Sequence, residues 1–114
     1  MVLNNQWGSI FIAEEVVATI AGLATTECYG VVGMAPRTWS EGITDILGRD
    51  SLSKGVEVIW ENERLRIEVH IVVGYGTRIS EVARNIISQV KYRVTGCIEM
   101  PVDWVTVNVR SVKV

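Results

Sequence analysis

The most regular hydrophobic pattern in the chain runs through residues 56–61 and 64–73. In both stretches apolar residues alternate with polar or charged ones, and a period of two is typical of a strand that buries one face. A two-residue turn at Asn62–Glu63 would join the stretches into a β-hairpin. In that register Ile59 lies opposite Arg66 on the polar face. Because a sheet with one apolar and one polar face is usually packed on its apolar face alone, the sheet is predicted to be covered on one side only.

Two other stretches repeat apolar residues at helical spacing. The first predicts a helix over about residues 13–27, and the second predicts one over about residues 77–95. Gly96 would end the second helix in the left-handed conformation. The wide apolar faces predict that both helices pack against the sheet. In the first helix one apolar row is formed by Val16, Ile20 and Leu23, with Val17, Ala21 and Ala24 beside it, so the predicted buried face is wide.

Shorter apolar runs complete the predicted architecture. Residues 8–12 and 31–34 indicate strands, and a final strand begins at about Val102. The alternation in this last strand shifts before Val112, which predicts a bulge or the strand end. Residues 36–54 are rich in turn-forming residues and form a connector. The order β-α-β-connector-β-β-α-β predicts an α+β fold, a two-layer α/β sandwich whose mixed sheet carries two amphipathic helices on one face.

The composition narrows the class of protein. The chain has 114 residues, of which 48% are hydrophobic, and this fits one globular domain over residues 1–114. A net charge of -2 provides no long-range attraction to nucleic acid or to anionic lipid. The first residues lack the pattern of a secretion signal, and no apolar stretch is long enough to insert across a bilayer. We therefore expect a cytoplasmic protein that reaches a membrane only through a partner.

The residue types that usually carry chemistry are few and scattered. His70 is the one histidine and lies in the middle of a predicted strand, where we expect a solvated surface side chain. Cys28 and Cys97 follow the ends of the two predicted helices, where the helix dipole disfavours a thiolate. Both cysteines are therefore interpreted as small packing residues. We identify no catalytic, cofactor-binding or metal-binding set of residues, and we expect that the chain is not an enzyme.

One turn in the sequence has the geometry of a candidate anion site. Gly74, Gly76 and Arg78 lie between a predicted strand and the start of the second helix, where backbone N–H groups can hold a phosphate or carboxylate. The third glycine of a dinucleotide motif and the lysine of a P-loop are absent. The alternative is that Gly76 only permits a tight corner between the strand and the helix.

The polar sheet face is the candidate partner interface. Trp104 would lie on this face, and Trp39 would lie in the connector beside it. An aromatic residue in such a place is either a lid on the core or the anchor of an interface. Aromatic, aliphatic and charged side chains together are typical of an interface. The candidate interface residues are Trp39, Ile59, Arg66, His70, Trp104 and Arg110.

The sequence also contains several short motifs whose order and spacing, taken together, are specific. They are residues 8–22 with Gly30-Val31, residues 53–58, Tyr75-Gly76 before residues 79–83, Thr95-Gly96, and residues 105–109. In this order the chain resembles the alkaline-shock-protein family, the envelope stress response proteins of Gram-positive bacteria. The similarity extends over about residues 8–112.

The resemblance implies a small cytoplasmic protein with no established enzymatic activity and a link to cell-envelope homeostasis. It also implies self-association into homo-oligomers and docking to a separate membrane-anchored protein. The rival interpretation is a nucleic-acid-binding or regulatory domain that uses Arg64, Arg66 and Arg110 on the open sheet face. The acidic balance of the chain and the interleaved Glu57, Glu61 and Glu68 make nucleic acid the less favoured partner.

Overall fold

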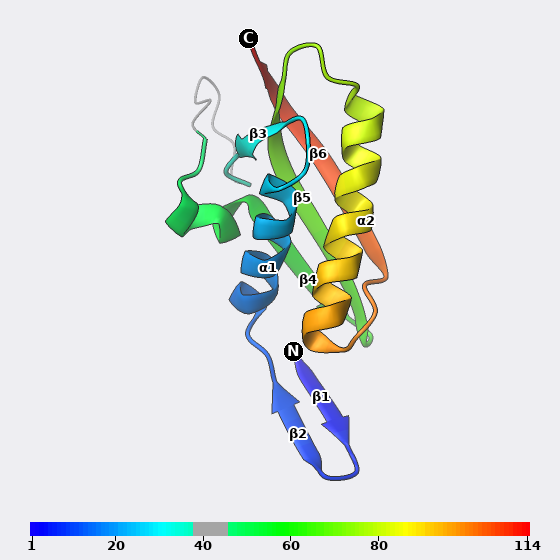
Figure 1. Ribbon diagram of the computed structural model, residues 1–114. Coiled ribbons are helices and arrows are strands. Elements are labelled where there is room, and N and C mark those ends of the chain that lie inside the picture. Colours follow the sequence, from blue (N-terminus) through cyan, green and yellow to red (C-terminus); the bar gives the residue numbers. More distant parts are fainter. Residues whose placement is uncertain (38–45) are drawn as a thin grey trace.

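The two long α-helices in the described part of the chain lie on the same face of one mixed sheet (Figure 1). The computed structural model describes residues 1–37 and 46–114. The strands are β1 (Val2–Asn5), β2 (Gly8–Phe11), β3 (Val31–Met34), β4 (Val56–Glu61), β5 (Arg64–Gly74) and β6 (Trp104–Lys113). The helices are α1 (Glu14–Thr26) and α2 (Ile79–Ile98), with a 3₁₀ helix η1 (Arg49–Gly55) before β4. The predicted α+β two-layer sandwich is confirmed.

Strand β5 is the centre of the main sheet. Its first half pairs with β4 and its second half with β3, both antiparallel, while β6 pairs with it in parallel along the other edge. The predicted hairpin register is confirmed, with Trp60 opposite Leu65 and Ile59 opposite Arg66. Asn62 and Glu63 both have positive φ angles, as a two-residue hairpin turn requires.

Strand β6 contains the irregularity that its sequence predicts. Ile71 pairs with Val109, whereas the next residue, Val72, pairs with Ser111. Arg110 is therefore the extra residue of a β-bulge. The bulge explains why the apolar alternation shifts before Val112.

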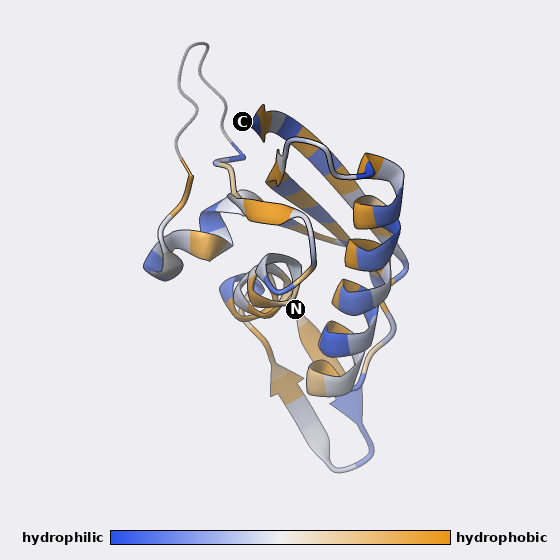
Figure 2. Cartoon of the chain, turned by 45° about the horizontal axis from the view of Figure 1, so that its top comes forward, coloured by the Kyte–Doolittle hydropathy of each residue, from blue (hydrophilic) through white to orange (hydrophobic). Residues whose placement is uncertain are grey.

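The hydrophobic core lies between the helices and the inner face of the sheet. Figure 2 shows that α2 directs its hydrophobic positions inward, and Ile86, Val90 and Val94 are fully buried. In α1 the buried positions include Val17, Ala21 and Ala24, and Ile20 and Leu23 are partly buried against the core, whereas Val16 is half exposed. The predicted wide apolar face is thus confirmed, with Val16 at its exposed edge. Small side chains at the buried positions let α1 approach the sheet and α2 closely.

Helix α2 continues one turn beyond the predicted end. Gly96 lies inside the helix, and the left-handed residue that ends it is Glu99, with φ 56°. The N–H of Glu99 donates to the carbonyl oxygen of Thr95. Ile98 is buried in the core, so burial of this last turn outweighs the low helix propensity of glycine. The prediction that Gly96 stops the helix was therefore wrong.

The N-terminal strands form a separate unit. Among residues 1–37 and 46–114, β1 and β2 pair only with each other in a two-stranded antiparallel sheet, and the hairpin projects from one end of the molecule (Figure 1). The predicted strand at residues 8–12 is present, but it was wrongly assigned to the main sheet. Its partner β1 was not predicted, because Val2–Asn5 has only two apolar residues.

The connector carries one regular element among its described residues, the helix η1. Leu52 of η1 is buried, and a Cβ atom added to Gly22 of α1 would lie 3.1 Å from Leu52 Cβ. Glycine at this position therefore allows η1 to pack directly on α1. Trp39, a candidate interface residue, lies outside the described residues.

Candidate interaction surface

Three of the candidate interface residues form one row across the uncovered face of the sheet. Ile59 of β4 pairs with Arg66 of β5, and Arg66 pairs with Trp104 of β6. Residues paired across neighbouring strands lie on the same face, and both helices lie on the other side of the sheet (Figure 1). Arg66 and Trp104 are exposed, and Trp104 keeps 59% of its surface accessible. An aromatic ring thus lies beside a guanidinium and an aliphatic side chain, as the sequence predicted.

His70 lies further along the same face, but it is not the solvated side chain that we expected. Only 5% of its surface is exposed. Arg110 donates a hydrogen bond from Nε to Nδ1 of His70 at 3.0 Å, so Nδ1 is deprotonated. Burial lowers the pKa of His70, the nearby Arg110 lowers it further, and Glu68 and Glu57 partly oppose the shift. His70 and Arg110 thus form a pair of their own.

The middle of the face is polar and acidic. Glu57 pairs with Glu68, and Glu68 pairs with Thr106. Asn108 Nδ2 donates to Glu68 Oε1 at 3.4 Å. Carboxylates therefore separate Arg66 from Arg110 along the face. This separation is unfavourable for a continuous contact with the phosphates of a nucleic acid.

The candidate anion residues lie at the turn between β5 and α2. Gly76 has a φ angle of +86°. This is the left-handed conformation that a tight corner between the strand and the helix requires, and glycine adopts it readily. Arg78 precedes the first residue of α2 and pairs with Glu81 at 3.4 Å on the surface. Arg78, Thr77 and Tyr29 line a pocket of about 460 Å³. Anion binding at Gly74, Gly76 and Arg78 stays a prediction.

The two cysteines have different environments. Cys28 is buried after α1, and its Sγ contacts the carbonyl oxygen of Ala24 at 3.4 Å. Burial raises the pKa of this thiol, which keeps it protonated. Cys97 is exposed and lies within α2 rather than after its end. The packing role is thus correct for Cys28 and wrong for Cys97.

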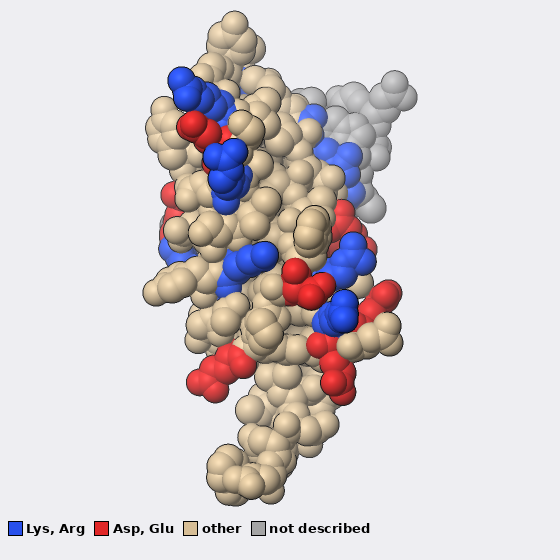
Figure 3. Space-filling view, turned by 90° about the vertical axis from the view of Figure 1, so that its right-hand side faces the viewer, with Lys and Arg blue, Asp and Glu red and all other residues tan. Residues whose placement is uncertain are grey.

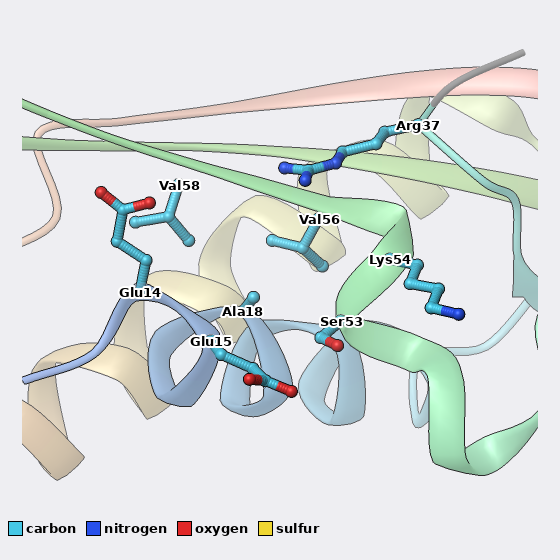
Figure 4. A pocket seen from close by; sticks show the side chains of 8 residues that line it. All are labelled: Glu14, Glu15, Ala18, Arg37, Ser53, Lys54, Val56 and Val58. Atoms are coloured by element: carbon cyan, nitrogen blue, oxygen red, sulfur yellow. The ribbon is translucent and has the colours of Figure 1, made fainter.

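A further pocket of about 310 Å³ lies between α1, η1 and β4 (Figure 4). Glu14 and Glu15 line it from α1, whereas Arg37 and Lys54 line it from the connector. In Figure 4 the Arg37 guanidinium extends above Val56, and the Glu14 carboxylate points toward Val58. Among residues 1–37 and 46–114, no group of three or more His, Cys, Asp or Glu side chains is placed to hold a metal ion.

Two strongly exposed aromatic residues lie outside the set of candidate interface residues. Trp7 and Phe11 lie on the β1–β2 hairpin, and Trp7 keeps 83% of its surface exposed. The detectable signal was the absence of any charged side chain from residue 2 to residue 13. This stretch is uncharged yet contributes few residues to the core.

A family model for the alkaline shock protein 23 family, described as having a cell envelope-related function, matches residues 2–114. The chain belongs to this alkaline-shock-protein family. The match confirms the resemblance seen in the sequence.

Two similar bacterial proteins agree with the assignment. The chain is 44% identical to the uncharacterized protein YloU of Bacillus subtilis (strain 168) over 113 residues, which cover 98% of this chain and 94% of YloU. It is 34% identical to the uncharacterized protein Spy1614 of Streptococcus pyogenes serotype M6, covering 98% and 93% of the two chains.

Solved structures share the fold of this alkaline-shock-family chain. The structure titled "MamM-CTD H285A" superposes with a TM-score of 0.52 at 15% identity, covering 87% of this chain and 98% of the other. The structure titled "MamM CTD M250L" gives the same TM-score and identity over 86% and 96% of the chains. At this identity the similarity supports the α+β fold alone. Among the described helices of the alkaline-shock-family chain, none is long and apolar enough to span a membrane.

Proposed function

We propose that this alkaline-shock-family protein is a non-enzymatic interaction module of cell-envelope homeostasis or stress response. It acts by self-association and by docking to a membrane-anchored partner protein, and it uses the uncovered face of the main sheet. The observation that carries the proposal is the row Ile59, Arg66 and Trp104. These side chains are aligned on one face and lie on the opposite side of the sheet from both helices.

The chemistry of this row suits a protein partner. Tryptophan and arginine are both among the residue types enriched at the positions that dominate the binding energy of protein interfaces. The carboxylates of Glu57 and Glu68 on the same face would repel nucleic acid and anionic lipid headgroups. The same carboxylates can pair with basic groups of a partner protein and contribute to specificity. A protein partner thus fits this face better than a polyanion.

The substitution Trp104→Ala tests the proposal. It should weaken self- or partner association by roughly 1–4 kcal/mol and leave the folded structure intact. Sedimentation measures the association and a thermal melt measures the fold. The matched control is Tyr92→Ala, which removes another exposed aromatic ring from α2.

Arg66→Glu should also weaken association, and the loss should be larger at low salt.

Two results would contradict the interface. A sharp fall in melting temperature for Trp104→Ala, with association unchanged in the folded fraction, would make Trp104 a lid on the core. Tight RNA binding at physiological salt with a steep salt dependence would favour the rival nucleic-acid function.

Docking to a membrane-anchored protein needs a separate experiment. Membrane vesicles from a Gram-positive bacterium should bind the purified chain, and liposomes made from the lipids of those vesicles should not. Equal binding to both would contradict the proposed protein anchor. Protease treatment of the vesicles before mixing is the control, and it should abolish the binding.

A further inference from the structure

We propose that the β1–β2 hairpin of one copy docks on the opposite end of a second copy, in a head-to-tail contact. The inference rests on the self-association in the proposed function and assigns that self-association to two surfaces other than the uncovered sheet face, which then serves the membrane-anchored partner. The receiving surface, here called the acceptor end, consists of Tyr29, Tyr75, Arg78 and Lys113.

The hairpin has the properties of a docking element. Its strands are exposed along nearly their whole length, and its apolar side chains Ile10, Phe11 and Trp7 face solvent. Figure 3 shows it as a projection without charged residues. An isolated two-stranded hairpin is marginally stable in water, and an exposed apolar patch of this kind usually marks an interaction site.

The turn of the hairpin is organised so that Trp7 projects. Oδ1 of Asn5 accepts hydrogen bonds from the backbone N–H groups of Trp7 at 2.8 Å and Gly8 at 3.0 Å. Ser9 Oγ donates to Asn4 Oδ1 at 2.6 Å. These bonds hold the backbone without using the indole ring. The ring is therefore presented at the tip, where it can contact another molecule.

Carboxylates surround the base of the hairpin. The helix α1 begins directly after β2, and the β4–β5 turn and the end of α2 reach the same end of the molecule (Figure 1). Glu63 and Glu99 line a pocket together with Val2 and Ile10 of the hairpin. The acidic residues at this end are Glu14, Glu15, Glu61, Glu63, Glu99 and Asp103, and the basic Arg64 lies among them beside the β4–β5 turn. Such a cluster repels an anionic bilayer, so a membrane surface is a poor occupant for the hairpin.

The acceptor end has complementary chemistry. Helix α1 and strand β5 both run away from the hairpin, so Tyr29 and Tyr75 lie at the far end of a molecule 52 Å long (Figure 1). Tyr29 is 83% exposed. The backbone N–H of Tyr75 donates to the carbonyl oxygen of Lys113, which places these two residues together. Tyr29 and Arg78 line the pocket of about 460 Å³, and an indole ring can stack on such aromatic and guanidinium groups.

These two ends differ, so the contact is heterologous. The hairpin brings an uncharged aromatic tip with carboxylates at its base. The acceptor end offers tyrosines, a lysine and an arginine, and Glu81, which pairs with Arg78, lines the same pocket. A contact between different surfaces leaves one hairpin and one acceptor end unoccupied in each pair, so further copies can add as open chains or rings. The complementary charges favour this arrangement over hairpin against hairpin, where carboxylates would face carboxylates.

Sedimentation of the full chain with two variants tests the contact. Trp7→Ala removes the indole ring but keeps the backbone N–H of the turn. Arg78→Glu reverses the charge at the acceptor end, and a carboxylate at a helix N-terminus is compatible with folding. Each variant should weaken self-association at least tenfold with unchanged thermal melting. Tyr92→Ala, which removes an exposed ring from neither end, should associate like the natural chain.

The decisive measurement is a mixture of the two variants. Trp7→Ala retains an intact acceptor end and Arg78→Glu retains an intact hairpin, so the mixture should form 1:1 dimers that do not grow further. A mixture that stays monomeric would overturn the head-to-tail contact. Association that survives Trp7→Ala but is lost in Trp104→Ala would also overturn it, while it would leave the proposed function standing. A natural chain that stays monomeric at all concentrations would instead contradict the self-association in the proposed function.

Discussion

Arg110 and His70 are joined by a hydrogen bond across β5 and β6, with Arg110 Nε 3.0 Å from His70 Nδ1. The bulge in β6 places Arg110 as the extra residue next to the strand pair His70–Asn108. A deprotonated Nδ1 is needed to accept from the guanidinium, because a protonated imidazole has no acceptor. The geometry therefore links the protonation state of one buried histidine to the conformation of the bulge.

Stability should fall as the pH drops through the ordinary pKa of histidine, about 6.5. The folded state lowers the pKa of His70, so below about pH 6.5 the unfolded chain binds more protons than the folded chain and is favoured. The charged groups near His70 are Arg110, Arg37, Glu57 and Glu68. Urea unfolding at pH 7.5 and pH 5.5 should show the loss, and NMR titration of the single imidazole should give the folded pKa directly.

The control for this pH dependence is His70→Asn. This variant lacks the titrating group, so its stability should change less between the two pH values, even though the substitution itself lowers stability at pH 7.5. An equal loss in the variant would show that other groups cause the dependence. Arg110→Gln should raise the pKa of His70 in the same NMR titration, because it removes a neighbouring positive charge.

Gly76→Val should destabilise the fold by about 1–3 kcal/mol, because its φ of +86° is hostile to a β-branched residue. A Cβ atom at Gly76 would meet no other atom within 4 Å, so the cost comes from the backbone alone. Thermal and urea unfolding measure it. Gly76→Asn should cost much less, since asparagine tolerates the left-handed conformation. Equal losses in the two variants would contradict a backbone origin.

Gly96→Ala should stabilise the protein by about 0.5–1 kcal/mol. Gly96 is exposed in the last turns of α2, and a Cβ atom there would meet nothing within 4 Å. Alanine lowers the backbone entropy of the unfolded chain and introduces no clash. Urea unfolding with an unchanged m-value measures the gain. A loss of stability would instead support a left-handed conformation at this position.

Cys97 should react with a maleimide reagent in the folded protein, and Cys28 should not. Cys97 is exposed on α2, whereas Cys28 is buried and its thiol has a raised pKa. Mass spectrometry should find one label per chain under native conditions and two labels in denaturant. Cys97→Ser removes the native label and is the control. Two labels without denaturant would contradict the burial of Cys28.

Local patterns determined much of this protein. The alternation in residues 56–73 and the two-residue turn were enough to predict the β4–β5 register, because a hairpin pairs residues that are close in sequence. The shift of alternation before Val112 likewise predicted either a bulge or the strand end, and the structure has the bulge, since side chains must change faces where an extra residue enters a strand. The row Ile59, Arg66 and Trp104 followed from the same parity once β6 was placed beside β5.

Only the tertiary structure decided which of several compatible surfaces became buried. The periodicity of α1 permits either Val16 or Val17 at the centre of its buried face, and close approach to η1 and α2 selects Val17. His70 alternates like a solvent-facing residue, but the bulge brings the Arg110 side chain to it. The sequence of β2 would have the same local pattern whether the strand lay in a separate hairpin or in the main sheet. Its place outside the main sheet depends on which sheet edges β3, β4 and β6 already occupy. Strand propensity is a local property, so it carries no information about distant edges.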